Sequence, residues 1–528
     1  MTPLPDAPLP DDLATHFELV ADIAPDRLAV TRGDESLTWG AFEDSAARLA
    51  GWLAGQGVGD GDRVAMMARN SPDYLVALFA IWKLRATMVN VNYRYRAEEA
   101  AYVLADANAK AVIADPDLLD VARAASAGTA LVVRLGDGTD GPALPRTQRE
   151  GDREWLLYTG GTTGNPKAVV GSHAERCRTA QSGTLRNLGL DRADGVDALR
   201  AALAVDPQGP DGIVWLPAPP LMHGTGLYSA LGALAAGAPV ALLPGRGTSG
   251  EDMAATIDRH GVTDLTIVGD AFALRLLDAL DADAAAGRPP RIARLRRIRS
   301  IGAVWSPAVK RRLLTHADLA LHDSIAASEG GLYAVSVVTR DTPDDRLGGF
   351  ELAPNARLLD ENDRDVVPGS GVVGLLAAPV VAGAGYAGDP EKTAGAFRDL
   401  DGVRLSIPGD MARLGADGRL ELLGRGSSVI NTGGEKVYAD EVEIVLREHP
   451  AVRDVVVVGV PDPMYGSVVG AVVALEKGRE ATPDTLRDFV SARLASYKKP
   501  RRLLLAPEVE RLASGKADLR WARDQLRS

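Results

Sequence analysis

The sequence predicts an α/β protein with a large N-terminal domain, in which sheets are flanked by helices, and a small α/β C-terminal domain. Three observations support this class. The 528 residues exceed what one ordinary hydrophobic core needs. Strand-like and helix-like segments alternate along most of the chain, which is typical of sheets covered by helices. The residue pattern also changes near Gly424, where a run of small residues begins.

Strand-like segments are followed by helix-like segments at several places in the N-terminal part. The clearest pairs are 62–70 with 71–85, 109–117 with 118–126, and 238–245 with 251–261. We find no short internal repeat. Residues 196–212 are interpreted as an insertion or a long loop.

Gly424 to Ser428 form the best candidate domain boundary because glycine and serine are frequent in flexible linkers. We therefore predict an N-terminal domain of residues 1–425 and a C-terminal domain of residues 426–528. In the latter, segments 452–460 and 467–476 are predicted to be strands. A helix is expected to begin at Thr482, an N-cap residue, with Pro483 at the first helical position.

Composition excludes several classes of function. The net charge of −12 argues against general nucleic-acid binding. Cys177 has no partner cysteine, so no internal disulfide is expected, and a structural thiol is the favoured interpretation. The N-terminus lacks the basic and apolar parts of a signal peptide, and no apolar stretch reaches the ~20 residues that span a bilayer. We expect a cytoplasmic enzyme without membrane insertion.

The strongest chemical signal is the segment from Tyr158 to Val170, with the sequence YTGGTTGNPKAVV. Its glycines allow backbone N–H groups to approach an anion, its threonines add hydroxyl donors, and its lysine adds charge. The spacing differs from the P-loop of kinases and GTPases. The predicted phosphate-binding residues are Thr159, Gly160, Gly161, Thr162, Thr163, Gly164 and Lys167.

This motif and others in the same order resemble the adenylate-forming superfamily of acyl-CoA synthetases, luciferases and peptide-synthetase adenylation domains. The resemblance covers almost the whole chain. It includes the segments ESLTWGAFEDSAARLAGWLAGQGVGDGDRVAMMARNSPDY, WLPAPPLMHGTGLYS, IPGDMARLGADGRLELLGRGSSVINTGGEKVYADEVE, SYKKPRRLLL and RLASGKADLR. Within the family, the residue pattern of the sequence is most similar to that of CoA ligases for steroid-like or other bulky hydrophobic acids. The resemblance implies ATP, coenzyme A and Mg²⁺ as cosubstrates and cofactor.

The resemblance assigns the adenylation site residue by residue. It implies that Lys516 bridges the substrate carboxylate and the α-phosphate, and that Glu329 holds Mg²⁺, since a hard cation prefers carboxylate oxygen. It implies that Asp410 binds the ribose hydroxyls. The remaining nucleotide contacts that it implies are Gly302, Asp323, Ala326, Ser328 and Arg425.

The resemblance also implies a site for the thiol. Gly433 and Gly434 match positions that line the pantetheine tunnel, His223 matches the residue between the acyl site and the tunnel, and Ser427 matches the hinge. The resemblance further implies that the N-terminal domain contains several subdomains and that the small C-terminal domain is mobile about this hinge. For the nucleotide end of coenzyme A, the resemblance implies contacts from Arg94, Tyr465, Tyr497 and Lys499.

Four positions depart from the family pattern. Ile325 and Ala326 replace an aromatic residue and a glycine beside the adenine, Ala168 replaces a glycine after Lys167, and Pro408 replaces a threonine. These changes lie on the nucleotide side, whereas the thiol tunnel matches. We therefore hypothesise that adenylation is weakened, so that a preformed acyl-adenylate from a separate adenylating enzyme is the main substrate.

The acyl-site segment from Ala218 to Leu234 is apolar and lacks the Asp that holds an amino-acid ammonium group. This argues against an amino acid as the substrate. The segments IVGDAFALRLL and DSIAASEGG resemble the branch of the family that activates steroid side chains and other bulky hydrophobic acids. The resemblance implies a bulky hydrophobic carboxylic acid of the terpenoid or steroid kind, typical of secondary metabolism. The alternatives are loading of a carrier-protein phosphopantetheine, a luciferase-like oxygenase and a nonenzymatic binding module.

Overall fold

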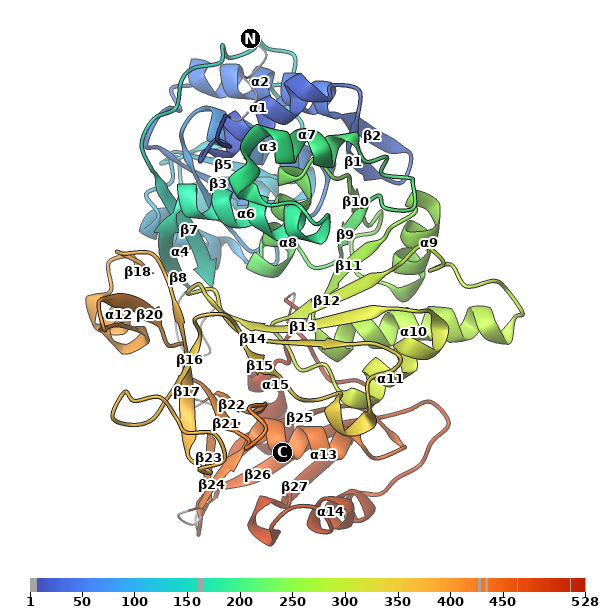
Figure 1. Cartoon of the computed structure of the whole chain (residues 1–528). Helices are drawn as coiled ribbons and strands as arrows, with labels where there is room; N and C mark the ends of the chain where they lie inside the picture. The colour runs from blue at the N-terminus through green and yellow to red at the C-terminus, as the bar shows by residue number, and fades with distance from the viewer. Residues whose placement is uncertain are drawn as a thin grey trace. The chain divides into compact units, whose positions relative to one another are not determined.

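A computed structural model describes residues 7–159, 166–425, 429–432, 435–462, 464–512 and 514–527. The chain folds into two compact units (Figure 1). The first comprises Met1–Ile267, Asp278–Ile298 and Val381–Gly395, and the second comprises Val268–Leu277, Arg299–Val380 and Ala396–Ser528. The predicted α/β class, with a large N-terminal part and a smaller C-terminal part, is confirmed.

The first unit is built on three groups of strands. β3 (Arg63–Met67), β4 (Thr87–Asn90), β5 (Ala111–Ala114) and β6 (Leu131–Arg134) form a parallel sheet in the order β4-β3-β5-β6. β7 (Glu154–Thr159), β8 (Lys167–Ser172) and β18 (Gly385–Tyr386) are antiparallel. β1 (Leu28–Arg32), β2 (Glu35–Thr38), β9 (Trp215–Pro217), β10 (Val240–Leu242) and β11 (Asp264–Ile267) form the run β11-β9-β10-β1-β2.

Helices connect and cover these strands. They are α1 (Leu13–Ile23), α2 (Trp39–Gly55), α3 (Pro72–Lys83), α4 (Ala97–Asp106), α5 (Leu119–Ser126), α6 (His173–Asn187), α7 (Gly195–Ala204), α8 (Gly224–Ala235), α9 (Gly250–His260) and α12 (Pro390–Ala396). The strand-then-helix pairs predicted from the sequence are present as β3 with α3, β5 with α5, and β10 with α9.

The prediction of a loop over 196–212 is wrong in its first half, which is α7. Val196, Leu199 and Ala202 recur every three residues and are buried. This spacing places them on one face of a helix, so packing of that face outweighs the insertion-like appearance of the sequence. The loop itself begins only after Ala204.

The second unit contains antiparallel sheets. β13 (Ala320–Ala326), β14 (Leu332–Val338) and β15 (Glu351–Leu352) form one, and β12 (Arg297–Ile301) precedes them. β16 (Arg357–Leu359), β17 (Val373–Pro379), β19 (Phe397–Leu400), β20 (Val403–Ser406), β21 (Asp410–Leu414) and β22 (Leu420–Arg425) form another. α11 (Pro307–His316) lies between β12 and β13, and α10 (Gly269–Ala285) contributes residues to both units.

The C-terminal part of this unit has its own sheet, in the order β24-β23-β26-β25, with β27 parallel to β26. Its strands are β23 (Val429–Thr432), β24 (Glu435–Tyr438), β25 (Val452–Asp462), β26 (Gly466–Leu475) and β27 (Arg502–Ala506). Its helices are α13 (Ala439–Arg447), α14 (Pro483–Ser491) and α15 (Leu519–Arg527).

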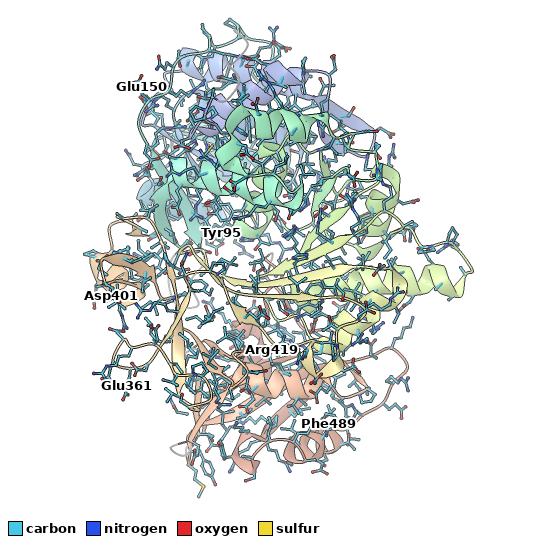
Figure 2. All side chains as sticks on the ribbon, in the orientation of Figure 1. Tyr95, Glu150, Glu361, Asp401, Arg419 and Phe489 are labelled. Atoms are coloured by element: carbon cyan, nitrogen blue, oxygen red, sulfur yellow. The ribbon has the colours of Figure 1, made fainter. Side chains whose placement is uncertain are left out.

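The side chains of successive valines in β25 point alternately to the two faces of this sheet, and they contribute to one hydrophobic core on each face. Val455 and Val457 pack with α13 and α14, whereas Val456 and Val458 pack with α15. The predicted cap of α14 is confirmed, because the Thr482 hydroxyl accepts the Thr485 N–H. Phe489 on α14 (Figure 2) packs edge-on to the His449 ring, with the ring centroids 4.9 Å apart.

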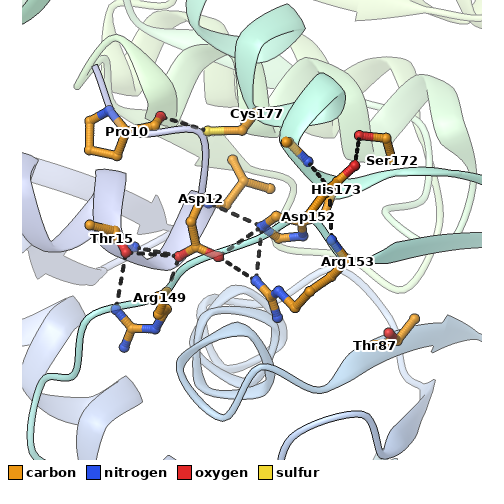
Figure 3. A network of polar contacts seen from close by, with 12 residues as sticks. Pro10, Asp12, Thr15, Thr87, Arg149, Asp152, Arg153, Ser172, His173 and Cys177 are labelled. Carbon is orange, nitrogen blue, oxygen red and sulfur yellow. Dashed lines mark hydrogen bonds and ion pairs between the residues drawn. The ribbon is translucent and has the colours of Figure 1, made fainter. Parts of the chain in front are cut away.

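Cys177 is buried on α6, where its thiol donates to the Pro10 carbonyl at 3.4 Å (Figure 3). Burial raises the pKa of this thiol well above its usual range. A high pKa keeps the thiol neutral and unreactive, which agrees with the structural interpretation. Within the described ranges, no helix has the length and apolar character needed to cross a bilayer.

Candidate adenylate-forming site

The turn between β13 and β14 carries two of the predicted nucleotide-site residues, Ser328 and Glu329. Both side chains are half-exposed. Gly330 and Gly331 follow with φ of 100° and 90°, a region that glycine adopts without strain. The chain therefore reverses directly after Glu329, and the antiparallel strands fix both ends of the turn. A single accessible carboxylate at such a turn fits a Mg²⁺ ion whose other ligands come from phosphate.

Asp323 lies on β13 and is almost completely buried, with 4% of its surface exposed. Its Oδ2 is 2.7 Å from Nζ of Lys310 on α11, which is also buried and donates to the Leu347 carbonyl. Burial raises the pKa of Asp323, and the Lys310 charge opposes that rise. Lys310 could not be identified from the sequence, because a lysine in an amphipathic helix is ordinarily solvated.

Ile325 and Ala326 end β13 at a register shift, where the pairing with β14 changes from Ile325–Ala334 to Ala326–Leu332. The Ile325 side chain packs against a core that contains Tyr333. Gly302 is exposed, with φ of 98°, directly after β12. Gly302, Ile325 and Ala326 therefore lie at the ends of β12 and β13, whereas Asp323 lies in the middle of β13, all within one unit.

Asp410 begins β21 and pairs with Arg425 at the end of β22. The exposed fraction of Asp410 is 9%. Pairing of their backbones brings the two predicted ribose-site residues together, although the Arg425 side chain lies outside the described part of the chain. Pro408 precedes Gly409, whose φ is 93°. Pro408 provides no N–H in this turn.

The ends of the phosphate loop lie on the β7–β8 hairpin, where Thr159 pairs with Lys167. Five predicted residues, Gly160, Gly161, Thr162, Thr163 and Gly164, lie outside the described residues. Lys167 Nζ is 3.4 Å from Asp389 Oδ2, and this ion pair lowers the pKa of Asp389 after the larger effect of its hydrogen bond from the Lys392 N–H. Ala168 is an ordinary strand residue paired with Tyr158, so its backbone does not require glycine.

His223 is the N-cap residue of α8 and is half-buried. Two asparagines that the sequence did not single out hold the segment before it. The Asn70 amide donates to the Pro219 carbonyl at 3.1 Å and accepts the Leu221 N–H at 2.7 Å. The Asn90 amide donates to the carbonyls of Tyr158 and Met222, both at 2.8 Å, and accepts the Tyr158 N–H.

Asn90 therefore links the strand that enters the phosphate loop to the residue before His223. Its three hydrogen bonds are buried, and buried amides must have their partners in place. No local sequence signal identifies such a residue, because its partners are 68 and 132 positions away. Asn90 therefore holds Tyr158 on β7 and Met222, which precedes His223, on the same side chain.

The residues predicted to bind coenzyme A are located as follows. Arg94 is exposed in the first unit, in the turn before α4. Tyr465, Tyr497 and Lys499 lie in the second unit, and the Arg501 guanidinium carbon is 3.9 Å from the centroid of the Tyr465 ring. The Lys498 ammonium bonds Glu441 at 2.5 Å and 2.7 Å. Ser427, Gly433 and Gly434 lie outside the described part of the chain.

Lys516 is exposed in a tight hairpin near the C-terminus. Its carbonyl accepts the Leu512 N–H at 2.9 Å, and the Arg511 guanidinium donates to the Gly515 carbonyl at 3.0 Å. Gly515 is buried with φ of 83°. The backbone on which the predicted adenylation lysine sits is therefore held from both sides.

Comparisons with known proteins identify the family of the chain. Residues 17–384 match the AMP-binding enzyme family and residues 441–516 match the AMP-binding enzyme C-terminal domain. A 3-oxocholest-4-en-26-oate–CoA ligase of Rhodococcus rhodochrous is 36% identical, covering 97% of this chain and 96% of its own length. A medium/long-chain-fatty-acid–CoA/3-oxocholest-4-en-26-oate–CoA ligase of Mycobacterium tuberculosis (strain ATCC 25618 / H37Rv) is 37% identical, covering 97% and 95%.

The fold is similar to the crystal structure of the anthranilate CoA ligase AuaEII in complex with anthranoyl-AMP. The TM-score is 0.81 at 21% identity, with 99% of this chain and 98% of that chain covered. The chain belongs to the AMP-binding enzyme family, within the adenylate-forming superfamily. The family predicted from the motifs is thereby confirmed.

Proposed function

We propose that this protein is an AMP-forming acyl-CoA ligase for a bulky hydrophobic carboxylic acid. The observation that carries the proposal is its similarity, over 97% of the chain, to ligases named for 3-oxocholest-4-en-26-oate. The apolar segment around His223 supports it, because α8 presents no carboxylate that could hold a substrate ammonium group.

In the first half-reaction, a carboxylate oxygen attacks the α-phosphorus of ATP, the bond to the β-phosphate oxygen breaks, and pyrophosphate leaves. Both reactants are anionic, so positive charge must surround them. Lys516 bridges the carboxylate and the α-phosphate, and Lys167 and the threonine hydroxyls hold the other phosphates. Glu329 would hold Mg²⁺, which would supply positive charge to the phosphate oxygens. The Asp410 carboxylate accepts hydrogen bonds from the ribose hydroxyls, and Asp323 borders the adenine.

In the second half-reaction, the thiol of coenzyme A loses its proton to water and its sulfur attacks the acyl carbon. The bond between that carbon and the bridging oxygen breaks, and AMP leaves with the bonding electrons. We propose that residues 426–528 move as a domain about Ser427 between the two steps, and that Gly433 and Gly434 line the thiol path. His223 lies between the acyl site and that path. Tyr465 and Lys499 bind the nucleotide end of the coenzyme.

Substrate profiling tests the proposed acid. The enzyme is incubated with ATP, Mg²⁺ and CoA and with 3-oxocholest-4-en-26-oate, a long-chain fatty acid or benzoate, and the thioesters are quantified by mass spectrometry. We expect kcat/KM to be at least about tenfold higher for the steroid acid than for benzoate, since each lost CH₂ contact weakens apolar binding. A preference for benzoate would contradict the proposal.

A finer proposal is that adenylation is the weaker half-reaction. It is supported by the replacements at Ile325 and Ala326, which lie at a register shift at the strand end beside the predicted adenine site, and by the missing N–H of Pro408. Ala168 gives it no support, because that residue has regular strand geometry. A preformed acyl-adenylate, supplied by a separate adenylating enzyme, would then be the main substrate.

Two rates measured on the same enzyme test this. They are pyrophosphate release from acid and ATP, and thioester formation from synthetic acyl-adenylate and CoA. We expect the second rate to exceed the first at least about tenfold, the effect of roughly 1.4 kcal/mol of lost transition-state stabilisation. Equal rates would refute the weakened half-reaction while leaving the ligase activity intact.

Loading of the acyl group onto a carrier-protein phosphopantetheine is the alternative second step. Coenzyme A has a nucleotide end and carrier-protein phosphopantetheine has none, so the need for that end distinguishes the two acceptors. Tyr465→Ala and Lys499→Ala should raise the KM for CoA several-fold, because stacking and phosphate contacts are lost, while the KM for pantetheine stays unchanged. Equal KM values for CoA and pantetheine in the unmodified enzyme would instead favour a carrier protein.

A further inference from the structure

Five charged side chains of the second unit connect α10 to the hairpin that carries Lys516. We call Asp270, Glu443, Arg447, Asp454 and Arg511 the Arg447 network. The side-chain exposures are 3% for Asp270, 7% for Arg447, 11% for Glu443, 14% for Asp454 and 12% for Arg511. Charges buried to this extent are costly unless they are paired in good geometry. Such a network therefore fixes the segments that it joins.

Within the C-terminal part, the network is closed by hydrogen bonds. Arg447 on α13 contacts Glu443 at 3.0 Å and donates to the Val455 carbonyl at 2.9 Å. Its Nη2 is also 3.8 Å from Asp454 Oδ1. The Asp454 carboxylate accepts hydrogen bonds from Arg511 Nε at 3.0 Å and from Arg511 Nη2 at 2.6 Å and 2.7 Å. Paired contacts of this kind define the orientation of a guanidinium.

Arg511 connects the Arg447 network to the hairpin that contains Lys516. Its remaining nitrogen, Nη1, donates to the Gly515 carbonyl at 3.0 Å. Gly515 immediately precedes Lys516, and a Cβ added at Gly515 would lie 2.7 Å from the Phe272 ring. The hairpin therefore rests closely on α10, within one turn of Asp270.

Contact with α10 also involves one ion pair, between Arg447 Nε and Asp270 Oδ2 at 3.5 Å. Asp270 Oδ1 accepts the Ser306 N–H at 2.9 Å. Among the described atoms, neither Asp270 Oδ2 nor Arg447 Nε has a hydrogen-bond partner. Coulomb attraction alone acts across this contact, so the two parts can separate without breaking a hydrogen bond there.

We propose that Asp270, Arg447 and Arg511 are positioning residues that hold Lys516 in its place for adenylation. Asp270 anchors the C-terminal part on α10 through Arg447, and Arg511 fixes the backbone next to the lysine. Breaking the Asp270 contact releases the hairpin and leaves the chemistry of the thiol step in place. This inference rests on the proposed function, because it assigns the adenylation role to Lys516.

Asp270→Asn is the decisive variant, since asparagine keeps the acceptor for Ser306 and removes the charge. Asp283→Asn is the matched control: Asp283 lies on the same helix, is 1% exposed, and is paired with Arg288 and Arg291 rather than with the C-terminal part. Acid-dependent ATP–pyrophosphate exchange measures adenylation, and synthetic acyl-adenylate with CoA measures the thiol step.

We expect Asp270→Asn to slow pyrophosphate exchange about tenfold, a factor typical of one coupled charge pair, with the thiol step unchanged or faster. Asp283→Asn should change both steps by the same factor. Equal effects of Asp270→Asn on both steps, or no effect on either, would overturn the proposal. If the unmodified enzyme lacks either half-reaction, the proposed function fails instead.

Two further measurements keep the proposal testable if Asp270→Asn does not fold. Arg511→Lys retains a charge beside Asp454 but loses the bond to the Gly515 carbonyl, so it should also slow exchange selectively. Hydrogen exchange of the unmodified protein should show residues 269–276 and 511–517 becoming less protected together when acyl-adenylate and CoA analogue are added. Unchanged pyrophosphate exchange in the variant, together with unchanged protection, would refute the positioning role.

Discussion

Lys310 and Asp323 form an ion pair that is enclosed by protein. The Lys310 ammonium also faces the rings of Trp305 and Phe350, at 5.4 Å and 5.7 Å from their centroids. Removing one member of a buried pair leaves the other charge without compensation. The pair therefore determines whether the carboxyl group beside the predicted adenine site stays ionised.

Lys310→Met should lower the free energy of unfolding by roughly 3–5 kcal/mol, because it strands the buried Asp323 carboxylate. The double variant Lys310→Met/Asp323→Asn should lose much less than the sum of the two single changes. Urea denaturation of the four proteins measures this coupling. Additive losses would show that the pair is not coupled.

His16 is a buried group whose protonation opposes folding. Burial, followed by the charge of Arg192, lowers the pKa of His16 to about 4, against a hydrogen bond to the Ala235 carbonyl. In the unfolded chain, histidine titrates near its ordinary pKa of about 6.5. The native state therefore binds fewer protons between these values, and stability falls as the pH decreases through this window.

We expect His16 to account for roughly 3 kcal/mol of unfolding free energy lost between pH 6.5 and pH 4, the equivalent of its pKa shift. Denaturation of the unmodified protein and of His16→Asn, at half-unit pH steps, isolates this contribution. The variant should show the shallower pH dependence. Identical pH profiles would contradict the assigned shift.

Sequence patterns point to candidate residues in contiguous motifs and do not point to residues whose partners lie far along the chain. Ser328, Glu329 and Asp410 could be named from their motifs. Asn90 and Lys310 could not, because an isolated Asn or Lys has no local pattern and its partners are known only once the chain has folded. Hydrogen bonds between distant segments are not encoded in spacing.

The element that carries Glu329 is the turn of the β13–β14 hairpin. A Cβ at Gly331 would lie 2.7 Å from the Ala378 Cβ, and its φ is 90°. The turn therefore has steric and conformational reasons to contain glycine. A change here displaces the carboxylate without altering its chemistry.

Gly331→Ala should destabilise the protein by roughly 1–3 kcal/mol and slow pyrophosphate exchange more than thioester formation from synthetic adenylate. Gly383→Ala is the matched control, since its φ is 84° and a Cβ there would meet nothing within 4 Å. Thermal unfolding and the two half-reaction rates are the measurements. A control variant with the same selective loss would show that strain alone is responsible.

Predictions for secondary-structure elements succeeded where a capping pair or a run of β-branched apolar residues was present. Thr482 and Pro483 marked the start of α14, and the valine-rich run 452–460 marked β25. The prediction failed for residues 196–204. The stretch from 206 to 212 is rich in glycine, proline and aspartate, and it made the preceding helix look like part of a loop. The helix is held by tertiary burial of one face.

At the scale of the whole molecule, we infer one order of chemical steps: the acid is activated through an acyl-adenylate before the thiol captures it. The family, the full-length similarity to CoA ligases and the residues at the strand ends all support that order. Transfer of a carboxylate oxygen atom from the acid to AMP tests this order directly.

The measurement uses a carboxylic acid labelled with ¹⁸O in both carboxylate oxygens, incubated with enzyme, ATP, Mg²⁺ and CoA. Attack of a carboxylate oxygen on the α-phosphorus transfers that oxygen to AMP when the thiol displaces it. We predict one ¹⁸O in each AMP formed and none in pyrophosphate, as read by mass spectrometry. Label in pyrophosphate or inorganic phosphate, or unlabelled AMP beside newly formed thioester, would contradict activation through the adenylate.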